Sequence, residues 1–319
     1  YAATPRAPAP VVEEPPIVVT GQRLTQLTQE YATALAGAAP ETEQIPRWNT
    51  DLCLSVAGVE PAVAQTLIDH IARRAHDVGL RAEHAGCQPN IVIVFADDSD
   101  TIARRIVETR RDLLGYLFSE ETVTAGREAL DEFANTPRAV RWWHVARRTM
   151  ADGQPLSDSG PGLPGPATSN NAAPGALPNA TGLPGGAHVG SFRGVDSVRS
   201  QATRVRSNTR QDLNFVLIIV DTRRVADVPQ QAMTDYLAMT ALAPISQHAD
   251  MSGLDSVLNV FALRRDNAPA ATAMTIWDTA YLQSLYTARP DAASVRQHNA
   301  DIARRMAEQI HSISNGETP

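Results

Sequence analysis

The chain has 319 residues, of which 43% are hydrophobic, and a formal net charge of −7. This negative balance argues against a nucleic-acid partner or an anionic membrane surface, because both bind basic proteins. All 28 basic residues are Arg, which excludes a Schiff-base lysine and the phosphate-binding lysine of a P-loop. No apolar run approaches the ~18 residues of a membrane-spanning helix, so we expect neither nucleic-acid binding nor a membrane span.

The domain organisation follows from where Pro and Gly gather. The chain opens on Tyr1 rather than Met, and its first residues look like what remains after an export signal has been removed. A later Gly/Pro-rich stretch has too little bulk to offset its chain entropy by burial. We predict a flexible N-terminal segment over 1–23, one α+β domain in two parts over 24–150 and 195–313, a flexible Gly/Pro-rich loop over 151–194, and a tail over 314–319.

The first half of the chain alternates apolar runs with helical periodicity. The run at 90–95 is almost unbroken, which is typical of a central strand buried on both faces. Ser99 can cap the helix that follows it. In chain order we predict a short strand at 17–23, a helix at 24–36, a strand at 52–57, a helix at 61–78, a strand at 90–95, a helix at 99–117, another helix from Ser119, and a strand with one partly wet face at 139–149.

The second half predicts two more strands and then helices. The strands 198–210 and 212–221 have a short junction, which favours an antiparallel hairpin. Pro244 ends a helix at 229–242, and the helical period returns at 275–286 and 292–313. Because strands dominate early and helices late, we predict an α+β fold, a mixed β-sheet with helices packed on one side.

The two cysteines, Cys53 and Cys87, lie beside predicted neighbouring strands. A scarce and even count of cysteines is typical of a single disulfide formed in an oxidising compartment. That bond would stabilise the fold by about 3–4 kcal/mol on the chain-entropy model. The alternative is two unrelated buried thiols, so the spacing alone leaves both interpretations open.

Complete catalytic motifs are missing from the sequence. None of the eight His has a second His four residues away, as a zinc-peptidase helix needs, and the nucleophile turn G-x-S-x-G is absent. We therefore expect no metal and no cofactor, and assign no catalytic residue. Four residues are candidates for a polar cleft: Asp97 and Asp98 at a strand end, His144 among aromatics, and His248. The alternative role of the aspartates is helix capping.

Two further groups are candidates for partner binding. Arg204 and Arg206 share one face of a predicted strand, where they form either a binding ridge or a charged edge that prevents aggregation. Ile17, Val18 and Val19 belong to the segment IVVTGQR. That segment resembles the short stretch of outer-membrane receptors that pairs with an energy-coupling partner, and it could add to the sheet of a partner. The alternative is a strand that docks on its own domain.

Several longer stretches resemble a group of exported alphaproteobacterial proteins, a resemblance that implies export and no particular activity. They are RWNTDLCLSVAGV at 47–59, GCQPNIVIVFADD at 86–98, RWWHVAR at 141–147, TRQDLNFVLIIVDTRRV at 209–225, DYLAMTALAPI at 235–245, LDSVLNVF at 254–261 and WDTAYLQSLY at 277–286.

The last third of the chain is loosely similar to zincin-type metallopeptidases, in which a zinc-binding helix precedes a turn and a late helix. Here Asp235 and Met239 would stand in place of the two zinc-binding His, and Tyr236 in place of the catalytic Glu. The resemblance therefore implies a zincin-like scaffold without zinc, and a shared fold alone licenses no function.

Taken together, these features predict an exported binding or assembly protein without catalysis, in the periplasm or associated with the outer membrane, whose partner is another envelope protein. The alternative is a peptidase-like hydrolase with an atypical site built from Asp97, Asp98, His144 or His248. A third hypothesis is a purely structural envelope component, which would form a stable homo-oligomer. The oligomeric state does not follow from the sequence.

Overall fold

A five-stranded mixed sheet forms the centre of the protein, with strand order β1-β2-β5-β4-β3. The computed structural model describes residues 21–36, 43–84, 86–116, 121–154, 156, 202–261 and 271–315. β1, β2 and β5 run parallel, and β4 and β3 are antiparallel to their neighbours. The predicted α+β fold with a mixed sheet is confirmed. The strands are β1 (Leu54–Ala57), β2 (Ile91–Ala96), β3 (Thr122–Val123), β4 (Val140–Met150) and β5 (Thr209–Asp221).

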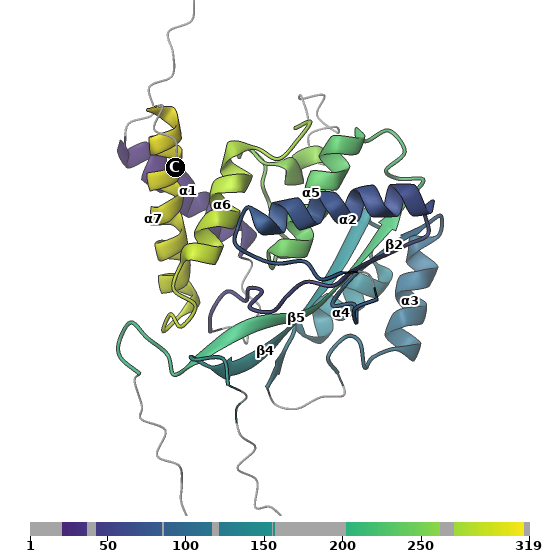
Figure 1. Cartoon of the computed structure of the whole chain (residues 1–319), viewed down its shortest axis with the longest axis horizontal. Coiled ribbons are helices and arrows are strands. Elements are labelled where there is room, and N and C mark those ends of the chain that lie inside the picture. Colours follow the sequence, from purple (N-terminus) through teal and green to yellow (C-terminus); the bar gives the residue numbers. More distant parts are fainter. Residues whose placement is uncertain are drawn as a thin grey trace, which may run out of the picture.

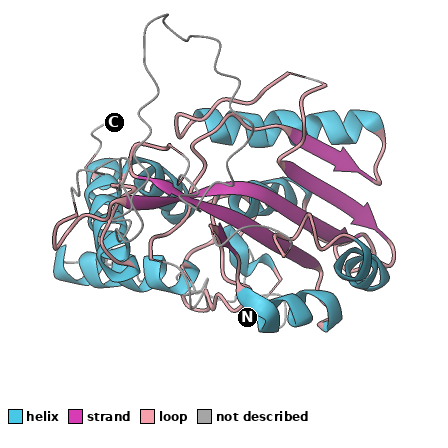
Figure 2. Cartoon of the chain, turned by 90° about the horizontal axis from the view of Figure 1, so that it is seen from below, coloured by secondary structure: helices cyan, strands magenta, loops and turns pink. Residues whose placement is uncertain are grey.

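Helices surround this sheet on both faces, where we predicted helices on one side (Figures 1 and 2). Neighbouring residues of β4 explain the difference, because Trp142 packs in the cluster beneath α2 and α5, and Trp143 in a second cluster beneath α3 and α4. The helices are α1 (Gly21–Leu35), α2 (Pro61–His76), α3 (Ser99–Thr109), α4 (Gly126–Asn135), α5 (Gln230–Leu242), α6 (Ile276–Thr287) and α7 (Val295–Ser314), with a 3-10 turn at Val257–Val260.

The predicted hairpin between 198–210 and 212–221 is wrong in its described part. β5 is one continuous strand, paired with β2 on one side and with β4 on the other. The predicted junction, Gln211 between Arg210 and Asp212, lies inside β5. Instead, the chain reverses earlier, where the N–H of Thr203 donates to the carbonyl of Arg206 at 2.9 Å. The apolar run predicted the strand correctly, but it did not indicate which strands would pair with it.

Three predicted boundaries also differ. α1 begins at Gly21, so residues 21–23 are helical rather than extended, and residues 17–20 lie outside the described part. α3 ends at Thr109 instead of continuing to 117. The helix predicted from Ser119 begins outside the described residues. Within them, Thr122 and Val123 pair with β4 instead of forming a helix, and α4 begins only at Gly126. Nearly all of the predicted Gly/Pro-rich loop lies outside the described residues.

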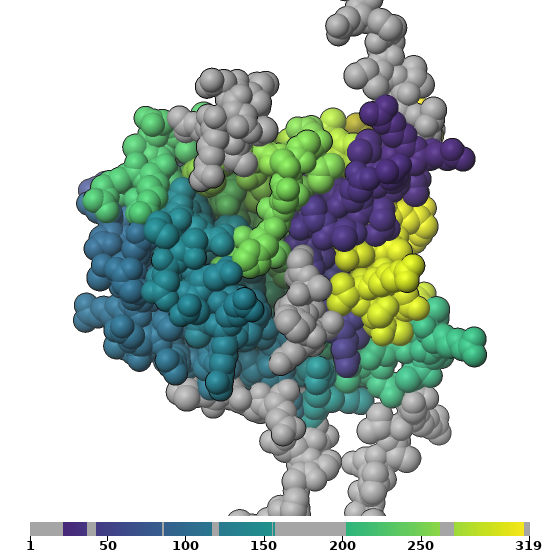
Figure 3. Space-filling view, turned by 180° about the vertical axis from the view of Figure 1, so that it is seen from behind, coloured from purple at the N-terminus to yellow at the C-terminus, as the bar shows by residue number. Residues whose placement is uncertain are grey.

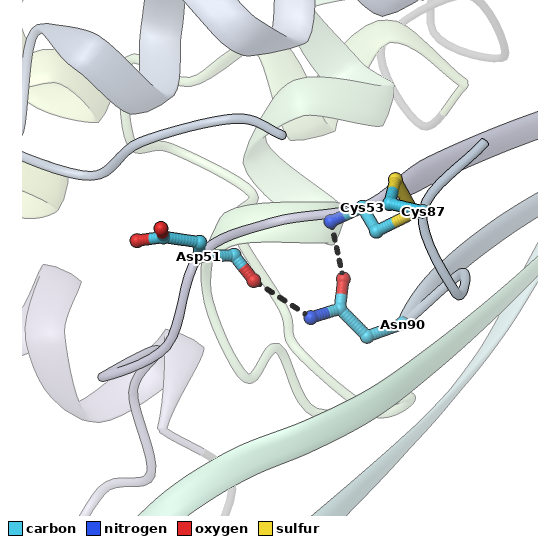
Figure 4. Close-up of a disulfide and its surroundings, with 4 residues drawn as sticks. All are labelled: Asp51, Cys53, Cys87 and Asn90. Atoms are coloured by element: carbon cyan, nitrogen blue, oxygen red, sulfur yellow. Dashed lines mark hydrogen bonds between the residues drawn. A yellow bond between two sulfur atoms is a disulfide. The ribbon is translucent and has the colours of Figure 1, made fainter. Parts of the chain in front are cut away.

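A disulfide between Cys53 and Cys87 confirms the predicted pairing. It ties the chain just before β1 to the loop just before β2. Asn90 holds the same two segments together, since its Oδ1 accepts from the N–H of Cys53 at 2.8 Å and its Nδ2 donates to the carbonyl of Asp51 at 3.0 Å (Figure 4). None of the helices in the described part combines the length and apolar character needed to cross a bilayer.

Candidate functional site

A cavity of about 290 Å³ lies beside β4. Both Trp142 and Trp143 line it, although the two side chains belong to the clusters on opposite faces of the sheet. A cavity that touches both faces of one strand must straddle the outer edge of that strand. Most of its remaining walls come from the start of α4 with the turn before it, from the segment 244–248 after α5, and from Ala36 and the segment 44–46 that follow α1; Leu213 of β5 and Val295 of α7 complete them. The teal, light green and purple regions to which the first three belong lie close together on the face shown in Figure 3.

The edge of β4 is open here because β3 is short. Thr122 and Val123 pair with Arg147 and Ala146, and the pairing stops there. The hydroxyl of Thr124 then accepts from the N–H of Gly126 at 3.3 Å, and Gly126 has a φ of 87°, a backbone conformation that favours glycine. This turn sends the chain into α4 and leaves the earlier residues of β4 without a strand neighbour among the described residues.

The backbone of His144 points toward this open edge. Arg148 donates its N–H to the carbonyl of Glu121 at 2.7 Å, and backbone groups alternate between the two edges of a strand, so Ala146, His144 and Trp142 share that direction. β5 gives independent support. Val216, the partner of His144 in the ladder, donates its N–H to Asn90 at 2.9 Å, on the side of β2.

The two outward-facing residues of this edge differ in what they bond. The carbonyl of Trp142 accepts from Nε2 of Gln247 at 3.1 Å. The N–H and carbonyl of His144 point away from β5, and no described loop backbone group or side chain bonds to them. His144 therefore offers one backbone donor and one backbone acceptor to whatever enters the cavity.

The side chain of His144 adds a third group. Its Nε2 lies 2.8 Å from the carbonyl of Thr240 on α5, so Nε2 carries the proton and donates it. Burial lowers the pKa of His144 to about 4, against which the hydrogen bond to Thr240 acts only weakly. The ring is therefore neutral at pH 7. Nδ1 carries no proton and is therefore an acceptor; it has no hydrogen-bond partner in the described part of the chain, and His144 is one of the residues that line the cavity.

Charged side chains lie next to His248, one of the residues that line the cavity. Nε2 of His248 lies 3.0 Å from Oε2 of Glu132 on α4, and a guanidinium nitrogen of Arg138 lies 3.7 Å from the same oxygen. Arg138 also donates to the carbonyl of Gln247 at 2.6 Å, which fixes this segment beside α4. Glu128 is exposed on the cavity wall and forms no ion pair with any described residue.

Of the four residues proposed for a polar cleft, His144 and His248 line the cavity, and Asp97 and Asp98 do not. Asp98 caps α3 by accepting from the N–H of Thr101 at 3.1 Å, and these hydrogen bonds lower its pKa. Asp97 accepts from the hydroxyl of Thr222. Both aspartates lie just beyond the carboxyl end of β2. Ser99, our predicted cap, instead donates to Asp221 at 3.0 Å.

Arg204 and Arg206 occupy an exposed turn and not a strand, so they do not share a strand face as predicted. Nε of Arg206 lies 3.9 Å from a carboxylate oxygen of Asp291, and the carbonyl of Arg204 accepts from Gln297 at 3.0 Å. The other predicted partner-binding residues, Ile17, Val18 and Val19, lie outside the described residues.

α5 is the helix that the zincin resemblance places at the zinc-binding position. Its Asp235 is fully engaged in hydrogen bonds within the protein. The carboxylate of Asp235 is buried and accepts from Nε2 of His70 at 2.7 Å, from Arg74 at 2.9 Å, from Gln231 at 2.8 Å and from the N–H of Met274 at 2.9 Å. Burial alone would raise the pKa of Asp235, but these hydrogen bonds lower it. Within the described ranges, no group of three or more His, Cys, Asp or Glu is arranged to hold a metal ion.

A second hollow of about 410 Å³ lies near the end of α6. Its charged side chains are already engaged. Arg47 donates to the carbonyls of Leu285, Tyr286 and Ala288, which end α6, and Arg81 pairs with Asp51 at 3.1 Å. The cavity beside β4 is therefore the stronger candidate.

Comparison with protein-family models, with curated proteins and with solved structures found no match to this chain.

The aromatic pair and His144 in the stretch RWWHVAR were visible in the sequence, but Gln247 and Glu128 carried no signal. Nothing local marks them, because they reach the cavity only through the packing of α4 and of the segment after α5 against β4.

Proposed function

We propose that this protein is a binding protein without catalysis, and that its ligand occupies the cavity at the outer edge of β4. One observation carries the proposal. His144 lines a cavity walled by two tryptophans, with its backbone donor and acceptor directed away from β5 and its Nδ1 without a hydrogen-bond partner in the described part of the chain. Mostly apolar walls with a few convergent polar groups are the usual composition of a ligand site.

The chemistry of His144 favours recognition over proton transfer. With a pKa of about 4, the ring is a weak base at neutral pH, far from the range in which general bases work best. Its one exchangeable proton is held by the carbonyl of Thr240. The hydrolase alternative draws on Asp97, Asp98, His144 or His248. Only the two histidines line the cavity, and the two aspartates lie beyond the end of β2. This alternative remains untested.

The compartment we propose is outside the cytoplasm, in the periplasm or at the outer membrane, with another envelope protein as the partner. The disulfide between Cys53 and Cys87 supports this, because such bonds persist in oxidising compartments. The resemblance to exported proteins agrees with it. Cell fractionation with alkylation of free thiols tests the compartment, and a reduced, cytoplasmic protein would contradict it.

A screen of small fragments by thermal shift tests the binding site. We expect aromatic fragments that carry a hydroxyl or N–H donor to raise the Tm. A ligand at ten times its Kd stabilises by about 1.4 kcal/mol, which is about 3 °C for a domain of this size. Ala125 is exposed and lines the cavity, so Ala125→Trp should fill the cavity and abolish the shift.

The matched control for this screen is Ala62→Trp, at an exposed position on α2 away from the cavity. It should keep the shift. A screen in which no fragment binds, or in which Ala125→Trp binds as well as the unmodified chain, would contradict the proposed function.

A further inference from the structure

The structure also points to the class of ligand, an inference that rests on the proposed function. We infer that the cavity binds an extended peptide segment, which pairs with β4 at His144 and adds a strand in the row that β3 begins.

The first reason is the place where β3 leaves the edge of β4. β3 already pairs with β4 at Ala146 and Arg147 and then leaves the edge. The cavity lies beside the next residues along the same edge, including His144 and Trp142. An added strand here would therefore continue the line of β3, in a row whose spacing from β4 is already that of a sheet.

The second reason is the pattern of hydrogen-bonding groups. An N–H and a carbonyl from one residue, both directed outward at a strand edge, match the carbonyl and N–H of one residue in a facing strand. Gln247 already occupies the carbonyl of Trp142. The pairing is consequently centred on His144 and ends before Trp142, so we expect a short contact of few residues.

The third reason is that the cavity has a wall on each face of β4. Successive side chains of an extended peptide point to opposite faces. One would meet the wall formed by Trp142 and Nδ1 of His144, and the next the wall near Trp143 and Ala129. A Ser or Thr hydroxyl on the first side can donate to Nδ1. An apolar side chain fits the second.

Charge restricts the peptide further. Glu128 is exposed on the wall without an ion pair among the described residues, and the described lining residues include no Arg. Since opposite charges across an interface favour association, we expect a basic residue in the peptide near Glu128.

The test uses the full chain and a pool of capped heptapeptides in which Leu, Val or Phe alternates with Ser, Thr or Arg. We expect members of the pool to bind, with their affinities measured by isothermal titration calorimetry. In the best binder, each residue is then N-methylated in turn, which removes one backbone donor and keeps the side chain.

We expect N-methylation of the residue that faces the carbonyl of His144 to weaken binding at least tenfold. N-methylation of the next residue, whose N–H points away from β4, should change the affinity less than threefold. Ala125→Trp should abolish peptide binding, and Ala62→Trp should not.

The outcomes separate the two proposals. If fragments bind in the cavity but no peptide of the pool binds, or if all N-methyl positions weaken binding equally, the peptide inference fails and the proposed function stands. If neither fragments nor peptides bind, both fail.

Discussion

Two parts of the molecule place polar groups among aromatic residues. In one part the polar atoms are hydrogen-bonded within the described part of the protein, and in the other several are not. Between α1 and α6, the buried carboxylate of Asp278 accepts from the hydroxyl of Tyr31 at 2.5 Å, from Ser256 at 2.6 Å, and from the N–H groups of Val257 and Thr275 at 2.8 Å. At the outer edge of β4, the backbone groups and Nδ1 of His144 have no such partners in the described part of the chain.

The difference shows which property marks a binding site in this fold. Asp278 is fully buried, whereas His144 is half-buried and lines a cavity. A buried polar atom without a partner costs free energy, so the open arrangement at His144 is tolerable only where a cavity admits water or a ligand. The closed network holds α1 to α6, and the open one is available for recognition.

The largest expected effect comes from breaking the closed network. Asp278→Ala would leave the donors of Tyr31, Ser256, Val257 and Thr275 without their acceptor. Because several buried donors lose their partner together, we expect a loss of about 4 kcal/mol in the free energy of unfolding, measured by urea denaturation.

The control for that loss is Asp69→Ala, at an exposed position on α2, which should cost less than about 0.5 kcal/mol. Equal losses for the two variants would show that the network around Asp278 contributes nothing particular to stability.

A pH titration extends the comparison to a second, more deeply buried histidine. His298 is fully buried, and its Nδ1 accepts from the N–H of Ile45 at 3.0 Å. Burial, helped by the charge of Arg47, lowers its pKa to about 4. The unfolded chain binds this proton near the ordinary value of about 6.5, so stability is lost as the pH falls from about 6.5 to about 4. For this one group the loss is roughly 3 kcal/mol.

We expect His298→Gln to flatten this part of the pH profile, measured as the free energy of unfolding at pH 7 and at pH 4.5. The titrating carboxylates are the same in both proteins, so their contribution cancels in the comparison. Parallel profiles for the two proteins would show that His298 takes up its proton equally well when folded.

The smallest expected effect is a difference in the free energy of unfolding between two glutamine variants. Gln231 donates to the buried carboxylate of Asp235 at 2.8 Å, and Gln247 donates to the carbonyl of Trp142 beside the cavity at 3.1 Å. We expect Gln231→Ala to cost about 1.5 kcal/mol, because its hydrogen bond is to a charged group. Gln247→Ala should cost about 0.5 kcal/mol, because water in the cavity can replace it. The reverse order in urea denaturation would contradict the distinction between closed and open regions.

Much of the fold could be predicted from apolar patterns. The run at 90–95 indicated a central strand, and β2 lies between β1 and β5 with Ile93 fully buried. Strand partners could not be predicted, because an apolar run indicates a buried strand without indicating which strand or helix buries it. This is why β5 was interpreted as half of a hairpin, and why helices were expected on one face only.

The site was less predictable than the fold. His144 stood out among aromatic residues, but the opening beside it depends on where β3 ends. That end is set by two residues of pairing and by the turn at Thr124 and Gly126, in a stretch where we expected a helix from Ser119. The disulfide could be predicted because cysteine count and compartment restrict the choices, and no comparable rule exists for an open strand edge.

Amide hydrogen exchange at His144, measured by NMR on the unliganded protein, tests the central claim most directly. The N–H groups of Trp143 and Val145 face β5, whereas that of His144 faces the cavity. We predict that the His144 amide exchanges at least 100-fold faster than the amides of its two neighbours, because it lacks a ladder hydrogen bond. Equal protection of all three amides would show that the edge is closed, and would contradict the account.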